Sequence, residues 1–339
     1  MSSPKPFQTF CQWWWGQLRT KWLLYIVLTI TTLTLCITFQ SPISRTAQAF
    51  VRSPVAYSGL TAKLNQLSSL ANQAWANQLE VLAQQTEAMD FTVPEHFRGK
   101  TIRSVPLPSG RKVIALTFDD GPLDPYTNNI LYILESNDVK ATFFLIGRSV
   151  QAFPNRAKHI QMKGHALANH SWSHPYAQQT AAGAAAQINN TDTWIQQTTG
   201  FTPKLFRPPG GILHNGMAGY AAQKGQVVVM WSSDSKDYYA SAPNIIKRVM
   251  AEASPGGIVL FHDGGGNRTQ TILALPLIIK QLREQGYEFV TVPELLKLYE
   301  EEVKAINTAK AAETAKAAET TQASPPAQPQ SQPPLTTGY

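Results

Sequence analysis

The chain has 339 residues, of which 43% are hydrophobic and 15% are charged, and its formal net charge is +7. This length allows one sizeable domain with extensions, or two modest domains. Most of the excess positive charge lies near the N-terminus, because six basic residues and no acidic residue precede Glu80. The body of the chain has no basic stripe with interleaved aromatic residues, so we expect no nucleic-acid partner.

Residues 1–49 predict a cytoplasmic segment followed by a signal peptide or a signal anchor. Residues 22–39 are apolar and uncharged, long enough to span a membrane, and Arg19 and Lys21 precede them. Ala47 and Ala49 form an A-x-A pattern typical of signal cleavage. We therefore expect an exported protein. It is either anchored in the membrane, facing the periplasm or cell wall, or secreted after cleavage near Ala49.

Residues 50–98 predict a helical stalk or linker, since leucines recur at helical spacing between Gln, Asn and Ser residues. Both cysteines, Cys11 and Cys36, precede this segment. The rest of the chain therefore has neither a disulfide nor a thiolate zinc site.

From residue 99 to residue 304 the sequence alternates between apolar runs of strand length and longer stretches of helical character. The expected strands cover residues 113–118, 141–146, 165–169, 203–207, 226–231, 257–261 and 287–292. The expected helices cover residues 127–137, 177–198, 215–224, 243–253, 270–285 and 293–304. Strand and helix in alternation predict an α/β fold with a parallel sheet, and seven strands suit a closed barrel.

Residues 305–339 differ in composition from the rest of the chain. An Ala, Lys and Glu repeat at 308–320 has high helix propensity, and the segment 323–334 is rich in Pro and Gln. The second piece has too few apolar residues to pack a core, so we expect it to be disordered. We interpret the whole tail as a spacer without chemistry.

Polar residues follow five of the predicted strands. In chain order they are Asp119 and Asp120, His170 and His174, Arg207, Asp234 and Asp237, and His262. In parallel α/β folds the reactive groups gather at the carboxyl ends of the strands. The sequence therefore predicts one polar site built from distant parts of the chain.

His170 and His174 have a spacing that suits one metal ion. With Asp120 as the third ligand they leave positions open for water and substrate. Two imidazoles and one carboxylate suit Zn²⁺, and also Co²⁺, Ni²⁺ or Fe²⁺. Asp119 can stay ionised beside Asp120 because the cation, and Arg207 if it pairs, offset the repulsion.

Five motifs carry a resemblance to a known family. They are Thr117-Phe118-Asp119-Asp120-Gly121, His170-Ser171-x-x-His174, Arg207-Pro208-Pro209, Asp234-x-x-Asp237-Tyr238 and Ile258-x-Leu260-x-His262. In this order they resemble the polysaccharide deacetylase family, the NodB-like carbohydrate esterases of family 4, over residues 111–298. The resemblance implies a distorted (β/α)7 barrel and one divalent metal ion, usually zinc. It also implies hydrolysis of the N-acetyl group of N-acetylhexosamine polymers.

The resemblance also implies roles for individual residues. The implied roles are base for Asp119, metal ligands for Asp120, His170 and His174, orientation of the base for Arg207, general acid for His262, charged partner of that acid for Asp237, and an apolar pocket for the acetate methyl from Ile258 and Leu260. The chemistry is independently reasonable, because a metal polarises an amide carbonyl and acidifies water, and a histidine can protonate the leaving amine.

The sequence departs from the family pattern at two substrate-binding positions. Gly210 stands where the family often has an aromatic residue, so another loop has to supply that wall of the sugar groove. A backbone N–H near Gly210 can still help to hold an oxyanion. Tyr238 stands where the family usually has Trp, and a tyrosine can stack on a sugar face.

Other polar residues have simpler interpretations. We expect Asp234 and Asp263 to form turns, and His165 and His214 to be structural or peripheral. Cell-wall peptidoglycan is the expected substrate, because export would place the enzyme beside the wall. The alternatives are a chitin or chito-oligosaccharide deacetylase, a catalytically silent glycan-binding protein, and a metallo-amidohydrolase acting on a small molecule.

Overall fold

The computed structural model describes residues 66, 69–70, 73 and 91–322. The predicted membrane segment, most of the predicted stalk and the Pro- and Gln-rich end lie outside the described residues. Within the described ranges, none of the helices combines the length and the hydropathy that a membrane crossing requires. The chain divides into two units, Met1–Ala88 and Met89–Tyr339, and the fold below is that of the second.

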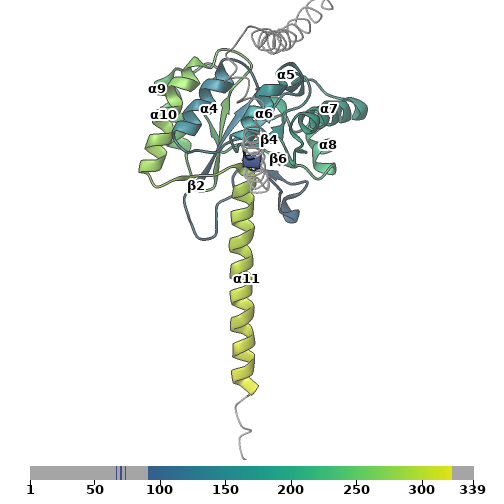
Figure 1. Cartoon of the computed structure of the whole chain (residues 1–339). Helices are drawn as coiled ribbons and strands as arrows, with labels where there is room; N and C mark the ends of the chain where they lie inside the picture. Colours follow the sequence, from purple (N-terminus) through teal and green to yellow (C-terminus); the bar gives the residue numbers. More distant parts are fainter. Residues whose placement is uncertain (1–65, 67–68, 71–72, 74–90, 323–339) are drawn as a thin grey trace, which may run out of the picture. The chain divides into compact units, whose positions relative to one another are not determined.

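All seven predicted strands are present, and they are parallel (Figure 1). They are β2 (Val113–Asp119), β3 (Thr142–Leu145), β4 (Ala166–Asn169), β5 (Leu205–Phe206), β6 (Val227–Val229), β8 (Gly257–His262) and β9 (Glu288–Phe289). Two short strands, β1 (Thr101–Ile102) and β7 (Ser233–Asp234), were not predicted. The strand order is β1-β6-β5-β4-β3-β2-β8-β7, and β9 pairs with β2.

One segment curls this sheet into a distorted barrel. Residues 227–234 pair first with β5, through β6, and then with β8, through β7. The same stretch of chain therefore pairs with strands from two different parts of the sheet and brings them together. β1 pairs with β6, and the Val105 N–H donates to the Gly256 carbonyl, just before β8, at 2.8 Å.

Eight α-helices among the described residues accompany the strands. They are α4 (Tyr126–Ser136), α5 (Gly147–Ala152), α6 (Pro154–Met162), α7 (Ala181–Thr199), α8 (Met217–Gln223), α9 (Ala242–Glu252), α10 (Thr269–Glu284) and α11 (Val292–Gln322). Short 3₁₀ helices form at Glu95–Phe97 and Pro209–Gly211. In Figure 1, α9 and α10 lie at the left of the view and α7 and α8 at the right, and residues of α4, α6, α7, α9 and α10 pack in one layer against the outer face of the sheet.

The structure differs from the expected helices in two places. The helices α5 and α6 were not predicted, because they are short and polar and Pro154 separates them. The helix expected at 293–304 extends to Gln322, since the Ala, Lys and Glu residues that follow are strong helix formers. Glu302 on this helix accepts hydrogen bonds from the Ser109 N–H and Oγ, at 2.9 and 2.8 Å.

Strand β2 is buried on both faces and divides the core into two layers. Ile114, Leu116 and Phe118 face outward and pack under α4 and α10. Val113 and Ala115 face the inside of the barrel. Because side chains alternate along a strand, the next two inward positions are Thr117 and Asp119. The barrel interior thus changes from apolar to charged at its carboxyl end.

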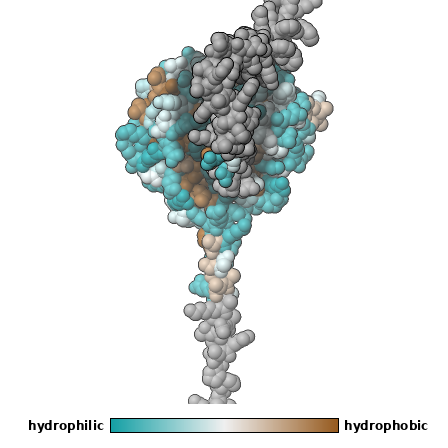
Figure 2. Space-filling model, viewed as in Figure 1, coloured by the Kyte–Doolittle hydropathy of each residue, from teal (hydrophilic) through white to brown (hydrophobic). Residues whose placement is uncertain are grey.

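The visible surface of the domain is mostly hydrophilic (Figure 2). Hydrophobic residues appear on the side where α9 and α10 lie, and Leu273 and Leu277 of α10 are exposed. Scattered exposed leucines are normal for a folded domain.

The packing of Phe143 generates a stability prediction. Its ring is fully buried and lies 5.1 Å from the Phe118 ring, centroid to centroid. Phe143→Ala leaves a cavity under the outer layer, so we expect a loss of about 3–5 kcal/mol in the free energy of unfolding. Urea denaturation measures it, and Leu277→Ala on the surface of α10 is the control, with an expected change within about 0.5 kcal/mol.

Candidate metal centre and active site

The carboxyl end of β2 presents two adjacent carboxylates to the same pocket. On a regular strand Asp119 and Asp120 would face opposite ways. Asp120 instead has a φ of 76°, in the left-handed region that aspartate tolerates better than most residues. This backbone turn allows both side chains to reach the pocket.

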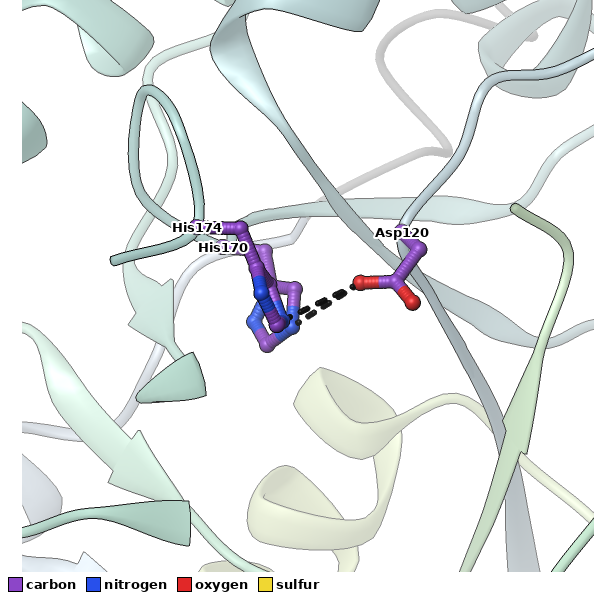
Figure 3. A group of neighbouring side chains, drawn as sticks. All are labelled: Asp120, His170 and His174. Atoms are coloured by element: carbon purple, nitrogen blue, oxygen red, sulfur yellow. Dashed lines mark ion pairs between the residues drawn. The ribbon is translucent and has the colours of Figure 1, made fainter. Parts of the chain in front are cut away.

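Asp120, His170 and His174 converge as the sequence predicted (Figure 3). Their donor atoms lie within 4.8 Å of one another. Asp120 Oδ1 lies 3.5 Å from His170 Nε2 and 3.3 Å from His174 Nε2. Asp120 Oδ1 is also buried without a hydrogen-bond partner among the described residues. A buried carboxylate oxygen aimed at two imidazole nitrogens fits a divalent metal ion.

The tautomer of His170 suits a metal ligand. Its Nδ1 lies 2.7 Å from the Arg207 carbonyl, which can only accept, so Nδ1 carries the proton. Its Nε2 lone pair then points toward Asp120 and His174. Burial, the largest influence, lowers the pKa of His170 to about 3. The imidazole is therefore neutral, as metal binding requires.

Asp119 is held by a buried arginine. Arg207 is 0% exposed, and its Nη1 donates to Asp119 Oδ1 at 2.7 Å and to Thr117 Oγ1 at 2.8 Å. Its guanidinium also stacks over the Phe144 ring at 4.0 Å. Burial raises the pKa of Asp119 above its usual value, although the charge of Arg207 opposes that shift. With Oδ1 occupied by Arg207, Oδ2 is the oxygen that can accept a proton.

His262 and Asp237 form the second buried pair. His262 Nδ1 lies 2.7 Å from Asp237 Oδ1, and Asp237 Oδ2 accepts from the His262 N–H and from Thr271 Oγ1, at 2.9 and 2.8 Å. Burial, the largest influence, lowers the pKa of His262, but the hydrogen bond and charge of Asp237 outweigh it and raise this pKa. The predicted pairing is therefore present in the structure.

A pocket of about 440 Å³ joins these groups. The lining residues include the metal-ligand group, Asp119 and His262. They also include three predicted substrate-binding residues, Gly210, Tyr238 and Leu260. Ile258 does not line the pocket: it is fully buried in the barrel core with Val113 and Ala115, which corrects its expected place in the acetyl pocket. Leu260 is two positions further along β8, so Ile258 lies about 6.6 Å deeper in the barrel.

Five residues that line the pocket were missed: Tyr176, Trp231, Lys236, Gly265 and Arg268. Tyr176 lines the pocket, is 60% exposed and packs its ring edge-on against His174 at 5.1 Å. A Cβ at Gly210 would lie 2.8 Å from Tyr176 Cε1, so Tyr176 occupies the space beside that glycine. Trp231 lines the pocket from the last position of the predicted strand 226–231. Arg268 also lines the pocket.

Asp263 has a larger structural part than the turn we expected. It is fully buried, and its Oδ1 and Oδ2 accept from the Gly121 N–H at 3.1 Å and from Thr127 Oγ1 at 2.6 Å. A Cβ at Gly121 would lie 2.1 Å from Asp263 Oδ2, so only glycine fits there. Burial raises the pKa of Asp263 to about 7. Asp263 thereby fixes the loop that carries Asp120.

Asp234, His165 and His214 have the simpler structural roles that the sequence predicted. Asp234 makes the expected turn contact, because its Oδ1 accepts from the Lys236 N–H at 3.0 Å, and it also lines the pocket. His165 is buried, accepts from the Ala141 N–H at 3.1 Å and lies away from the pocket lining. His214 is exposed and does not line the pocket.

Comparison with known proteins agrees with this geometry. The sequence model of the family described as polysaccharide deacetylase matches residues 107–229. A peptidoglycan-N-acetylglucosamine deacetylase of Bacillus cereus is 38% identical over 202 residues, which cover 56% of this chain and 91% of that protein. The peptidoglycan-N-acetylmuramic acid deacetylase PdaC of Bacillus subtilis is 39% identical over 202 residues, which cover 59% of this chain and 41% of PdaC.

Solved structures show the same fold. The crystal structure of the peptidoglycan N-acetylglucosamine deacetylase Bc1960 matches with a TM-score of 0.55 at 36% identity, covering 58% of this chain and 92% of that one. BA3943 of Bacillus anthracis, a pseudoenzyme of carbohydrate esterase family 4, matches with a TM-score of 0.54 at 31% identity, covering 58% and 69%. With the five motifs gathered on one barrel, these matches show that the chain belongs to the polysaccharide deacetylase family.

Proposed function

We propose that this protein is a metal-dependent deacetylase that removes the N-acetyl group from N-acetylhexosamine residues of cell-wall peptidoglycan. The observation that carries the proposal is the gathering of three metal donors, a buried base and a buried acid around one pocket. The relatives described above are named as deacetylases of peptidoglycan, which supports the choice of polymer. An exported chain, as the N-terminal sequence predicts, would meet that polymer.

Asp120, His170 and His174 would hold the cation, for which Zn²⁺ is our first candidate because two imidazoles and a carboxylate suit it. When bound, the cation polarises a carbonyl oxygen and lowers the pKa of adjacent water. The Asp120 oxygen that lacks a hydrogen bond is the position where the cation would supply the missing partner.

Asp119 is the proposed base. Arg207 holds its Oδ1, so Oδ2 faces the pocket and accepts the proton of the attacking water. A raised pKa makes this carboxylate a better proton acceptor than an exposed aspartate.

His262 is the proposed acid. Asp237 binds its Nδ1, so Nε2 is the atom that delivers a proton to the leaving nitrogen. Because Asp237 raises the pKa of His262, more of the imidazole is protonated near neutral pH. Gly210 lines the same pocket, where its backbone N–H can donate to the oxyanion.

The rim of the pocket favours a polymer over a small molecule. Tyr176 and Tyr238 are 60% and 49% exposed, and they flank His174 and His262 respectively. Exposed aromatic faces can stack on sugar rings that extend beyond the reacting residue. Leu260 provides an apolar surface for the acetate methyl group. Chitin oligomers share the same acetamide and are the second candidate substrate.

Replacement of the base tests the reaction itself. Asp119→Asn keeps the size of the side chain but removes the proton acceptor, so we expect acetate release from peptidoglycan and from chitin oligomers to fall by about 10²–10⁴-fold. Metal content should be unchanged. Asp138→Asn, at an exposed turn, is the matched control and should release acetate normally. Equal release by Asp119→Asn and the native protein would remove Asp119 from the role of base.

Replacement of a ligand tests the metal centre. His174→Ala removes one of three donors, so we expect at least a tenfold weaker affinity for Zn²⁺ in equilibrium dialysis, with acetate release lost in parallel. His214→Ala, at an exposed position outside the pocket, should bind Zn²⁺ like the native protein. Unchanged metal affinity in His174→Ala would contradict the ligand set.

The pH dependence of turnover tests the acid. Activity requires protonated His262, so it declines as the pH rises through the pKa of His262, which Asp237 holds above 6.5. Asp237→Asn removes that support, and the basic limb of the pH–rate profile should move to lower pH. Asp234→Asn removes a carboxylate of the same pocket that pairs with Lys236 instead, and its basic limb should stay in place. A limb unmoved by Asp237→Asn would exclude His262 as the titrating acid.

A further inference from the structure

Arg268 is a buried cation at the edge of the pocket that forms no ion pair with a carboxylate of the described residues. It is 4% exposed and lines the pocket beside the loop that follows Asp263. Its Nε donates to the Gly264 carbonyl at 2.6 Å. None of the ion pairs among the described residues includes Arg268, whereas Arg207 pairs with Asp119 and Lys236 pairs with Asp234.

The free end of Arg268 faces the same space as the metal-ligand group. Gly265 has a φ of 70°, and a Cβ there would lie 2.4 Å from Asp120 Oδ2 and 3.3 Å from Arg268 Nη2. The two groups therefore border one small gap, which any side chain at position 265 would fill. Asp120 Oδ1 points the other way, toward the two histidines.

A buried guanidinium needs an anion more than most groups do. It cannot lose its proton, and taking it out of water without a partner costs free energy. Binding of an anion within reach of its terminal nitrogens would recover that cost. The planar fork of arginine fits a carboxylate with two parallel hydrogen bonds.

We propose that Arg268 forms a carboxylate-binding subsite beside the reacting acetamide. The inference rests on the proposed function, because that function supplies two carboxylates at this place. One is the acetate that deacetylation releases. The other is the lactyl carboxylate on O3 of N-acetylmuramic acid, since C3 is adjacent to the C2 carbon that bears the acetamide. Asp119 and Asp120 would repel either anion, and Arg268 offsets that repulsion.

Binding measurements distinguish the two sources. By calorimetry on the metal-loaded protein we expect N-acetylmuramic acid to bind about tenfold or more tightly than its neutral methyl ester and than N-acetylglucosamine, as one charge-assisted contact predicts. In Arg268→Gln this preference should disappear, and the Kd for acetate should rise about tenfold. Arg268→Lys keeps the charge but loses the fork, so its values should be intermediate. Arg103→Gln removes an exposed arginine outside the pocket and should behave like the native protein.

Each outcome decides the inference. If Arg268→Gln weakens only the binding of acetate, the subsite binds the product. If it removes only the preference for N-acetylmuramic acid, the subsite binds the substrate. If native protein binds the acid and the methyl ester equally and binds acetate as Arg268→Gln does, the subsite does not exist. The ester comparison needs no variant, so it stands even if Arg268→Gln does not fold. Because binding and acetate release are measured separately, a protein that binds carboxylates but releases no acetate from any polymer would refute the proposed function and leave the subsite intact.

Discussion

The buried contact between Arg207 and Asp119 is the interaction on which the rest of the site depends. The Arg207 side chain also donates to the Val229 and Met230 carbonyls at 3.1 and 3.2 Å, and the Arg207 carbonyl accepts from His170. One residue thus links the ends of β2, β4, β5 and β6. Loss of one partner from such a pair typically costs about 3–5 kcal/mol, because a charge is left buried and alone. The base and the first histidine ligand are therefore positioned by the same side chain and backbone.

The geometry around this pair depends on strained backbone as well as on charge. Asp120 and His174 have φ values of 76° and 57°, which non-glycine residues rarely adopt. In these conformations both side chains point at a common centre. Asp263 holds the turn after Asp120 in place, and the Ser171 side chain accepts from the His174 N–H at 3.1 Å. Local strain at the site is thus maintained by buried hydrogen bonds around it.

Sequence patterns predicted the strands and the principal site residues because both depend on simple periodicities. Apolar runs identify strands buried on both faces, and the first polar residue after each run falls at the carboxyl end. What escaped prediction depends on contacts between distant loops. Tyr176 lies beside Gly210, and Arg268 and Asp120 border one gap beside Gly265, only after folding. Ile258 differs from Leu260 by depth along one strand, which a motif does not encode. The extended helix α11 reflects propensity that continues past the last packed residues.

The segment that pairs first with β5 and then with β8 has a mechanical consequence. Within residues 227–237, the first part supplies the carbonyls that anchor Arg207, and the last part supplies the carboxylate that anchors His262. The distance between proton acceptor and proton donor is therefore set by one short, continuous piece of polypeptide. A displacement of that piece would shift both anchors together, so the two halves of the proton-transfer machinery would move as a unit rather than drift apart.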